Sequence, residues 1–472
     1  MGEPARHAYD VRVWKTRSYK GKKRTTHSVR WRVHGVEHHK TFATAKLAES
    51  YRAALVVAVN RGEPFDPQSG LPQSMQPVKP GVTWLDHARD FVDHKWPRTS
   101  ARHRKGLAEA LTTVTMALWD SEPSSSRLDR LREYLRNEAF NTAARAATDD
   151  DTDPADQASQ EVRWAFSHSL PLAALLDRVV CRRAVEACGL KLDGTPAAPS
   201  TTARKRSALF SCLEFAVELG RLPTNPMTLI KVRRTVSQEV VDRRVVVNPD
   251  QARALLDAVR TVYPSLEAFF ACLYYAGLRP AEARHLRETD LALQATGWGE
   301  LTLRGSTQAG GTAWTDSGAA DEDRSLKHRV STQVRLVPAH PELVTILRRH
   351  LDAFQCSPDG RLFVVRAGTG GRPLPAPFSK PIPMGTAYRV WKAARERALT
   401  PQQVDSPLAR RPYDLRHACV STWLNAGVPA TQVAEWAGHS VNVLLRVYAK
   451  CVYGQEEAAK LRIEAALAAG NP

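Results

Sequence analysis

Three short segments in the C-terminal half of the chain carry residues that could together handle a phosphate group. Arg279 comes directly before a proline, which favours the first position of a helix and would hold the arginine rigidly. Tyr413 and Arg416 lie three residues apart, on one face of an expected helix. His439 is followed nine residues later by Tyr448. Guanidinium groups stabilise charge on phosphate oxygens and a tyrosine oxygen can attack phosphorus, so this set could cleave a phosphodiester by transesterification.

Each of these residues, taken alone, also has a purely structural interpretation. Arg279 could form an ordinary ion pair with Glu282, one turn into the same helix, and Tyr448 could be a half-buried packing aromatic. Asp414 suits the first turn of a helix, and we expect His417 to support the site rather than to act first. Only the order and spacing of the three segments favour a catalytic site.

In this order the segments resemble the tyrosine recombinase, or phage integrase, family. Its catalytic domain shows A-G-L-R-x-x-E, then H-x-L-R-H, then L-G-H with the nucleophilic tyrosine nine residues later. The corresponding segments here are Ala276–Glu282, Tyr413–His417, and Ala437–His439 with Tyr448. The resemblance covers residues 245 to about 460, and it implies a catalytic domain of mixed α and β structure over residues 245–472.

The family also carries a lysine on a hairpin, in a pattern like K-T-x-x-S-x-R-x-V-P. Residues 327–338 are similar, and Lys327 is the only lysine between Lys231 and Lys380. A stretch rich in Gly, Ser, Thr and Asp, Gly305–Arg324, lengthens this hairpin and could order only on DNA. The resting position of the lysine therefore stays open.

The resemblance implies a role for each catalytic candidate. Tyr448 would be the nucleophile and would store the phosphate as a 3′ ester. Arg279 and Arg416 would stabilise the negative charge of the five-coordinate transition state. Lys327 would protonate the leaving 5′ oxygen, and His439 would orient the groups or help to deprotonate them.

Tyr413 is the one clear departure, because the family most often has histidine there. A phenol with a pKa near 10 can donate a hydrogen bond to phosphate, but it is a poor general base at neutral pH. If the usual histidine removes a proton, another group must do so here. Glu282 and His417 are assigned supporting roles. We expect no metal and no cofactor, because no carboxylate cluster or nucleotide-binding glycine motif accompanies these residues.

Composition agrees with a nucleic-acid partner. The chain has 472 residues, enough for two to four domains, and 67 Lys or Arg against 49 Asp or Glu give a net charge of +18. Its seven cysteines show neither a zinc spacing nor a disulfide pattern. No apolar run is long enough to span a membrane, and no secretory signal is visible, so we expect a cytoplasmic protein associated with the nucleoid.

We expect a multidomain, mainly α architecture. Residues 1–60 hold 13 Lys or Arg against 4 Asp or Glu, and the alternating apolar residues of the domain expected over residues 1–62 predict a three-stranded sheet backed by one helix. Residues 63–81 form a proline-rich linker. Residues 82–235 predict an all-α domain with a disordered insertion near 141–160. By resemblance, these upstream domains would bind arm-type and core-type DNA sites.

Basic residues in both upstream domains are the candidates for contacts to DNA phosphates. They are Lys20, Lys22, Lys23, Arg24, Arg102, Arg104, Lys105, Arg204, Lys205 and Arg206. The expected partners are double-stranded attachment sites, three further copies of the chain in a homotetramer, and an excisionase or DNA-bending protein. A DNA-binding regulator without turnover and a relaxing topoisomerase are the alternatives.

Overall fold

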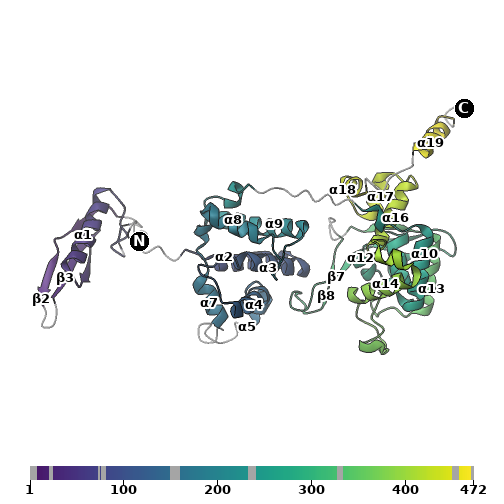
Figure 1. Ribbon diagram of the computed structural model, residues 1–472, viewed down its shortest axis with the longest axis horizontal. Coiled ribbons are helices and arrows are strands. Elements are labelled where there is room, and N and C mark those ends of the chain that lie inside the picture. Colours follow the sequence, from purple (N-terminus) through teal and green to yellow (C-terminus); the bar gives the residue numbers. More distant parts are fainter. Residues whose placement is uncertain are drawn as a thin grey trace, which may run out of the picture. The chain divides into compact units, whose positions relative to one another are not determined.

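The computed structural model describes residues 8–20, 25–67, 69–72, 75, 81–148, 160–231, 241–326, 333–448 and 456–468 (Figure 1). It divides into two compact units, Met1–Thr83 with Pro171–Ala173, and Trp84–Leu170 with Ala174–Pro472. The described chain is mainly helical with small sheets, as the sequence predicted.

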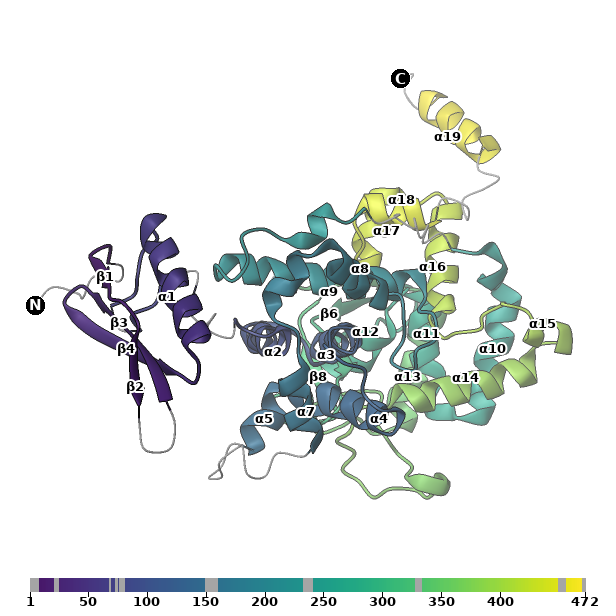
Figure 2. The same ribbon diagram turned by 60° about the vertical axis from the view of Figure 1, so that its left-hand side comes forward.

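The first unit contains a four-stranded antiparallel sheet with one helix packed on it (Figure 2). Its elements are β1 (Val11–Val13), β2 (Arg17–Lys20), β3 (Thr25–Val33), β4 (Val36–Phe42) and α1 (Ala45–Asn60). The buried side chains of Val29, Trp31 and Leu55 join the sheet to the helix. The sequence predicted only three strands. The fourth exists because β3 is long enough to pair with β1 along its second half and with β2 along its first half.

The second unit begins with a helical region. Its α-helices are α2 (Trp84–Lys95), α3 (Ala101–Thr115), α4 (Ser125–Tyr134), α5 (Thr142–Thr148), α7 (Gln160–His168), α8 (Arg178–Ala187) and α9 (Pro199–Glu218). The prediction of a disordered insertion near 141–160 is wrong at its start, because α5 is helical and Asn141 is buried. The Asn141 side chain donates a hydrogen bond to the Ala313 carbonyl at 2.9 Å. Residues 149–159 lie outside the described residues.

The remainder of this unit surrounds the predicted catalytic residues. Its α-helices are α10 (Pro249–Val262), α11 (Glu267–Tyr275), α12 (Pro280–His285), α13 (Pro341–Ala353), α14 (Met384–Ala398), α15 (Pro401–Asp405), α16 (Asp414–Asn425), α17 (Ala430–Ala437), α18 (Val441–Tyr448) and α19 (Glu456–Ala468). A sheet of β5 (Leu291–Ala292), β6 (Gly299–Leu303) and β9 (Arg335–Ala339) lies beside them. The apolar helix α11 is almost wholly buried at the centre, where it contacts α13 and α16.

The stretch Gly305–Arg324 forms an antiparallel hairpin of β7 (Ser306–Ala309) and β8 (Asp321–Arg324). The suggestion that it orders only on DNA is therefore wrong for these residues. The far end of the hairpin contacts the helical region: Arg104 Nη1 donates to the Trp314 carbonyl at 2.9 Å, and the Arg104 guanidinium binds both carboxylate oxygens of Asp316 at 2.7 and 2.9 Å. The hairpin thus fastens onto the N-terminal end of α3.

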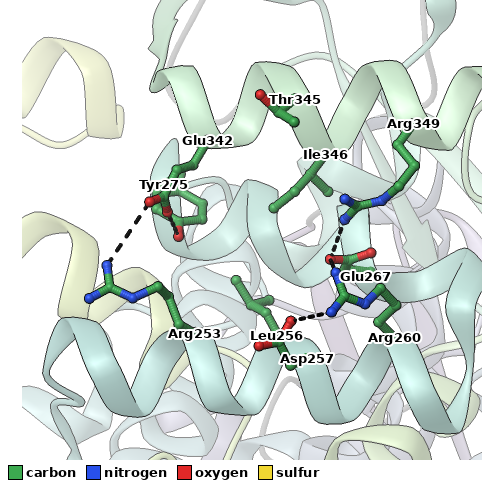
Figure 3. A pocket seen from close by; sticks show the side chains of 10 residues that line it. All are labelled: Arg253, Leu256, Asp257, Arg260, Glu267, Tyr275, Glu342, Thr345, Ile346 and Arg349. Carbon is green, nitrogen blue, oxygen red and sulfur yellow. Dashed lines mark hydrogen bonds and ion pairs between the residues drawn. The ribbon is translucent and has the colours of Figure 1, made fainter.

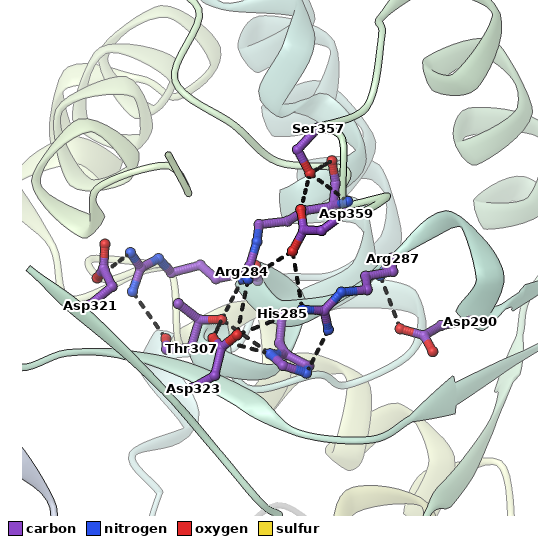
Figure 4. Close-up of polar contacts among 10 residues, drawn as sticks. Arg284, His285, Arg287, Asp290, Thr307, Asp321, Asp323, Ser357 and Asp359 are labelled. Atoms are coloured by element: carbon purple, nitrogen blue, oxygen red, sulfur yellow. Dashed lines mark hydrogen bonds and ion pairs between the residues drawn. The ribbon is translucent and has the colours of Figure 1, made fainter. Parts of the chain in front are cut away.

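The two strands of the hairpin contact a network of charged and polar side chains (Figure 4). Arg284 of α12 pairs with Asp321 at 2.7 Å, and Arg361 pairs with Asp323 at 3.0 Å. Burial favours the protonated form of Asp323, but hydrogen bonds from His285, Thr307 and Arg361 hold the pKa of its carboxyl well below its usual range. Both ends of the hairpin are therefore anchored by charged groups.

Candidate active site

Arg279 is the residue before α12, and its contacts with Glu282 of that helix hold it in place. Its backbone N–H donates to Glu282 Oε2 at 2.8 Å, and its Nη1 pairs with Glu282 Oε1 at 2.7 Å. The other oxygen of the same carboxylate also accepts from Arg335 Nη2 at 2.7 Å. Glu282 thus joins two arginines, and its side chain is only 3% exposed.

The guanidiniums near the Glu282 carboxylate change its pKa. Burial alone would raise the pKa of Glu282, but the guanidiniums of Arg335, Arg279 and Arg416 outweigh it and lower that pKa to about 2. Burial also opposes the charge of Arg279, yet the charge of Glu282 raises the pKa of that guanidinium. Glu282 is therefore ionised, and its negative charge offsets part of the positive charge of the site.

The turn between α17 and α18 brings the third segment to these arginines. Gly438 ends α17 in the left-handed conformation, at φ 64°, and its carbonyl accepts from Arg279 Nη2 at 2.7 Å. A Cβ atom there would stand 3.1 Å from Arg279 Nη1 and closer still to the guanidinium of Arg335. Glycine is thus required both by the backbone conformation and by the space available.

Arg416 is completely buried and binds the same turn. Its guanidinium donates to the carbonyls of Gly277 and Ala437, and its Nη2 lies 3.0 Å from His439 Nε2. An arginine can only donate, so His439 Nε2 must be the accepting nitrogen and Nδ1 must carry the hydrogen. Burial, followed by the charges of Arg416, Arg279 and Arg335, lowers the pKa of His439 to about 3, so its ring is neutral.

The site leaves buried donors unsatisfied. Arg335 Nε, Arg416 Nε and His439 Nδ1 are buried without a hydrogen-bond partner among the described residues. A buried N–H without a partner costs about 1–3 kcal/mol, and an oxyanion bound in the site could accept from it. Three such donors in one cluster are an arrangement suited to phosphate.

Tyr448, the last residue of α18, lies against the second segment. Its phenolic oxygen is 3.0 Å from His417 Nδ1, and its ring centroid is 6.2 Å from that of His439. The Tyr413 ring meets His417 edge-on, with centroids 5.0 Å apart. Tyr448 is 1% exposed. The structure thus brings together all the predicted catalytic residues it describes, whereas Lys327 lies outside the described residues.

Arg335 received no role in the sequence analysis, although it stands in the stretch compared with the family hairpin. Its signal was available in the strand pattern: residues 335, 337 and 339 of β9 are buried while Leu336 is exposed. An arginine at a buried strand position must have a partner. Its partner, Glu282, is 53 residues away in the sequence.

The expected DNA-contacting residues divide into two groups. Lys20, Arg102, Lys105 and Arg204 are exposed and Arg206 is partly exposed, whereas Lys22, Lys23 and Arg24 lie outside the described residues. Arg104 is buried by the hairpin, and its guanidinium stacks on Trp96 at 4.4 Å. Lys205 is buried too, with Nζ donating to Thr113 at 2.8 Å and to the Leu190 carbonyl at 2.7 Å. The prediction that Arg104 and Lys205 contact DNA is withdrawn, because neither side chain can reach a phosphate.

A separate cavity of about 230 Å³ lies between α10, α11 and α13 (Figure 3). Its charged groups are paired with one another: Arg349 binds Glu267 at 2.6 Å and Arg260 binds Asp257 at 2.7 Å. None of the predicted catalytic residues lines it.

Two features are absent from the described ranges. No helix there is long and apolar enough to cross a membrane. No group of three His, Cys, Asp or Glu side chains there could hold a metal ion.

Comparison with known proteins agrees with this geometry. Residues 246–453 match the model of the phage integrase family. The tyrosine recombinase XerC of Chlorobaculum parvum is 25% identical over 272 residues, which are 54% of this chain and 70% of that protein.

Similar solved structures include DNA complexes of two integrases. The Tn1549 transposon integrase with a circular intermediate DNA has a TM-score of 0.47 and 14% identity, over 81% of this chain and 99% of that one. The lambda integrase tetramer bound to a Holliday junction has a TM-score of 0.40 and 12% identity, over 90% of this chain and 95% of that one. By the match of the family model, residues 246–453 of this chain are similar to the phage integrase family.

Proposed function

We propose that the chain is a site-specific DNA recombinase, the integrase of a phage or other integrative element, which cuts and rejoins DNA through a 3′-phosphotyrosine at Tyr448. The observation that carries this proposal is the meeting of the Tyr448 hydroxyl and His417 next to a cluster of buried guanidiniums with unsatisfied donors. Tyrosine, imidazole and arginine in contact are the groups that a phosphodiester transesterification needs.

Arg279 and Arg416 stabilise the transition state. Arg279 donates to the Gly438 carbonyl, and Arg416 donates to the carbonyls of Ala437 and Gly277. Both guanidiniums are therefore held in place and need no reorganisation when charge develops on the non-bridging oxygens. The Nδ1–H of His439 donates to the same phosphate. Loss of one such donor typically lowers the rate by about 10²–10³.

The leaving 5′ oxygen takes its proton from Lys327, by resemblance to the family. The free energy of the broken phosphodiester is kept in the tyrosine ester, so rejoining needs neither ATP nor a metal ion. We therefore propose that cleavage and rejoining both proceed in the presence of a chelator.

The substrates proposed are paired double-stranded attachment sites, brought together by a homotetramer of this chain in the cytoplasm, on the nucleoid. Arg102, Lys105, Arg204 and Lys20 are exposed cations that contact DNA phosphates in this proposal. An excisionase or DNA-bending protein sets the direction of the reaction.

The test begins with DNA selected by the protein from a random duplex pool. Duplexes of the selected sequence, each with a nick at a different position, are incubated with the full chain in EDTA and stopped with SDS. A nick just 3′ of the cleaved bond lets the short 5′-hydroxyl fragment leave, so the covalent adduct accumulates. The wild type is expected to form the adduct and Tyr448→Phe to form none.

Two other outcomes would each contradict the proposal. Tight, selective binding with no adduct at any nick position would make the chain a DNA-binding regulator, for which the replacement of histidine by Tyr413 is the encouraging observation. An adduct accompanied by relaxation of plasmids that carry a single site, with no exchange between paired sites, would make it a topoisomerase.

A further inference from the structure

The site needs a group that removes the phenolic proton of Tyr448, and His417 lies next to that hydroxyl. The family's usual histidine is absent at position 413, and the phenol there is a poor base. His417 lies one turn further along, with Nδ1 at 3.0 Å from the Tyr448 hydroxyl oxygen and its ring centroid 5.7 Å from that of Tyr448. A ring nitrogen at hydrogen-bond distance from the attacking oxygen meets the geometric requirement for a general base.

We propose that His417 is the general base of strand cleavage and takes the phenolic proton of Tyr448 on its Nδ1. This inference rests on the proposed function. It gives His417 a direct part in the reaction, in contrast to the supporting role expected from the sequence.

The protonation state of the ring agrees with this role. Burial, followed by the charges of Arg416 and Arg411, lowers the pKa of His417 to about 4, so the free ring is neutral and has a lone pair to accept a proton. A bound phosphate would offset the charge of Arg416, which strengthens His417 as a base when the substrate arrives. The phenol becomes more acidic as its oxygen bonds to phosphorus.

The other candidate bases in the described part of the site are occupied. His439 accepts from Arg416 on Nε2, and its Nδ1 already carries hydrogen. Both carboxylate oxygens of Glu282 accept from arginines. Asp414 accepts from the Arg411 backbone at 2.8 Å.

The proton and bond changes balance. In cleavage, the bond from Tyr448 Oη to phosphorus forms, the bond from phosphorus to the 5′ oxygen breaks, and the phenolic proton moves to His417. The 5′ oxygen takes a proton from a second donor, for which Lys327 is the candidate. In rejoining, the 5′ hydroxyl gives its proton back to that second group as its oxygen bonds to phosphorus. The bond from phosphorus to Tyr448 Oη breaks, and the His417 imidazolium returns its proton to the departing Tyr448 oxygen.

The test measures single-turnover cleavage on the nicked duplex by full-length variants. His417→Asn is the informative change, because an amide oxygen near the position of Nδ1 can accept the hydrogen bond but cannot remove a proton. We expect cleavage about 10²–10⁴-fold slower at pH 7, with DNA binding retained. His417→Gln is measured in parallel, so that a folding failure of one amide does not decide the result.

Two controls separate a base from a residue that protonates the leaving group and from one that only positions the tyrosine. A duplex with sulfur in place of the bridging 5′ oxygen needs no leaving-group proton, so it should rescue Lys327→Ala but not His417→Asn. Raising the pH favours the phenolate without the help of a base, so the gap between His417→Asn and the wild type should narrow. The titratable or charged groups that face His417 are Tyr413, Tyr448, Arg411 and Arg416.

Three results would overturn the inference: both amide variants cleaving within a few-fold of the wild type, rescue by the sulfur substrate, or a gap that persists at high pH. A wild type that forms no adduct would instead refute the proposed function, so the two failures are distinguishable.

Discussion

Replacing Arg335 with methionine tests how strongly the ionised carboxylate of Glu282 is stabilised by the arginines around it. The pKa of Glu282 is lowered from 4.5 to about 2, chiefly by Arg335 and then by Arg279, against the opposing effect of burial. A group whose pKa is lower in the folded state stabilises the fold above its unfolded pKa, and this contribution is lost as the pH falls through the folded value. The shift corresponds to about 3 kcal/mol, and removing one member of a buried pair costs about 3–5 kcal/mol. We therefore expect Arg335→Met to lose about 3 kcal/mol at pH 7.

Differential scanning calorimetry of the full chain measures this loss. The transition of the unit that contains Glu282 should fall by about 4 °C. Arg253→Met is the matched control, because its ion pair with Asp250 is exposed and contributes little to stability. Adding Glu282→Gln to Arg335→Met should recover part of the loss, since no buried charge is then left short of a partner.

The stability of the fold measured at acid pH provides a second test. In the wild type, the contribution of Glu282 is lost between pH 4.5 and about 2. In Arg335→Met the loss should still begin near pH 4.5, which the unfolded chain sets, but it should be smaller and end at a higher pH, because the pKa of Glu282 in the folded state rises. A melting temperature at pH 7 within about 2 °C of the Arg253→Met control would refute the reasoning.

Three further predictions concern the turn, the hairpin and the DNA surface. Gly438→Ala should lower the melting temperature and slow adduct formation, because a left-handed residue with a side chain costs about 1–2 kcal/mol and the Cβ would push on two arginines. Arg104→Ala should speed hydrogen exchange in residues 306–324, whereas the exposed neighbour Arg102→Ala should not; equal exchange in both would count against the hairpin contact. Arg204→Ala should reduce the slope of log binding constant against log salt by about one. Lys205→Met should leave that slope unchanged and lower thermal stability, and the reverse pattern would contradict the burial of Lys205.

The predictions from sequence were most accurate where the signal is local. Pro249 and Pro280 mark the first residues of α10 and α12, as their restricted φ predicts, and Asn248 caps α10 with a reciprocal bond to Gln251. Strand β2 was missed because all four of its residues are exposed, which leaves no alternating apolar pattern to detect.

Contacts between distant segments were beyond the reach of sequence reasoning. His417 and Tyr448 are 31 residues apart, and nothing in either segment indicates that the imidazole meets the hydroxyl. Arg104 was expected to bind phosphate because basic residues at helix starts often do. Asp316, whose carboxylate it binds instead, is 212 residues away in the sequence.

The β7–β8 hairpin limits how modular this enzyme can be. Residues 84–148 and 160–231 are mainly helical, and they look like a segment that could be exchanged as one piece. Yet the Arg104 guanidinium binds the Trp314 carbonyl and the Asp316 carboxylate, and both residues are encoded far downstream. A graft that replaces the helical segment must bring its own hairpin with it, and the two sequences are therefore expected to be inherited together.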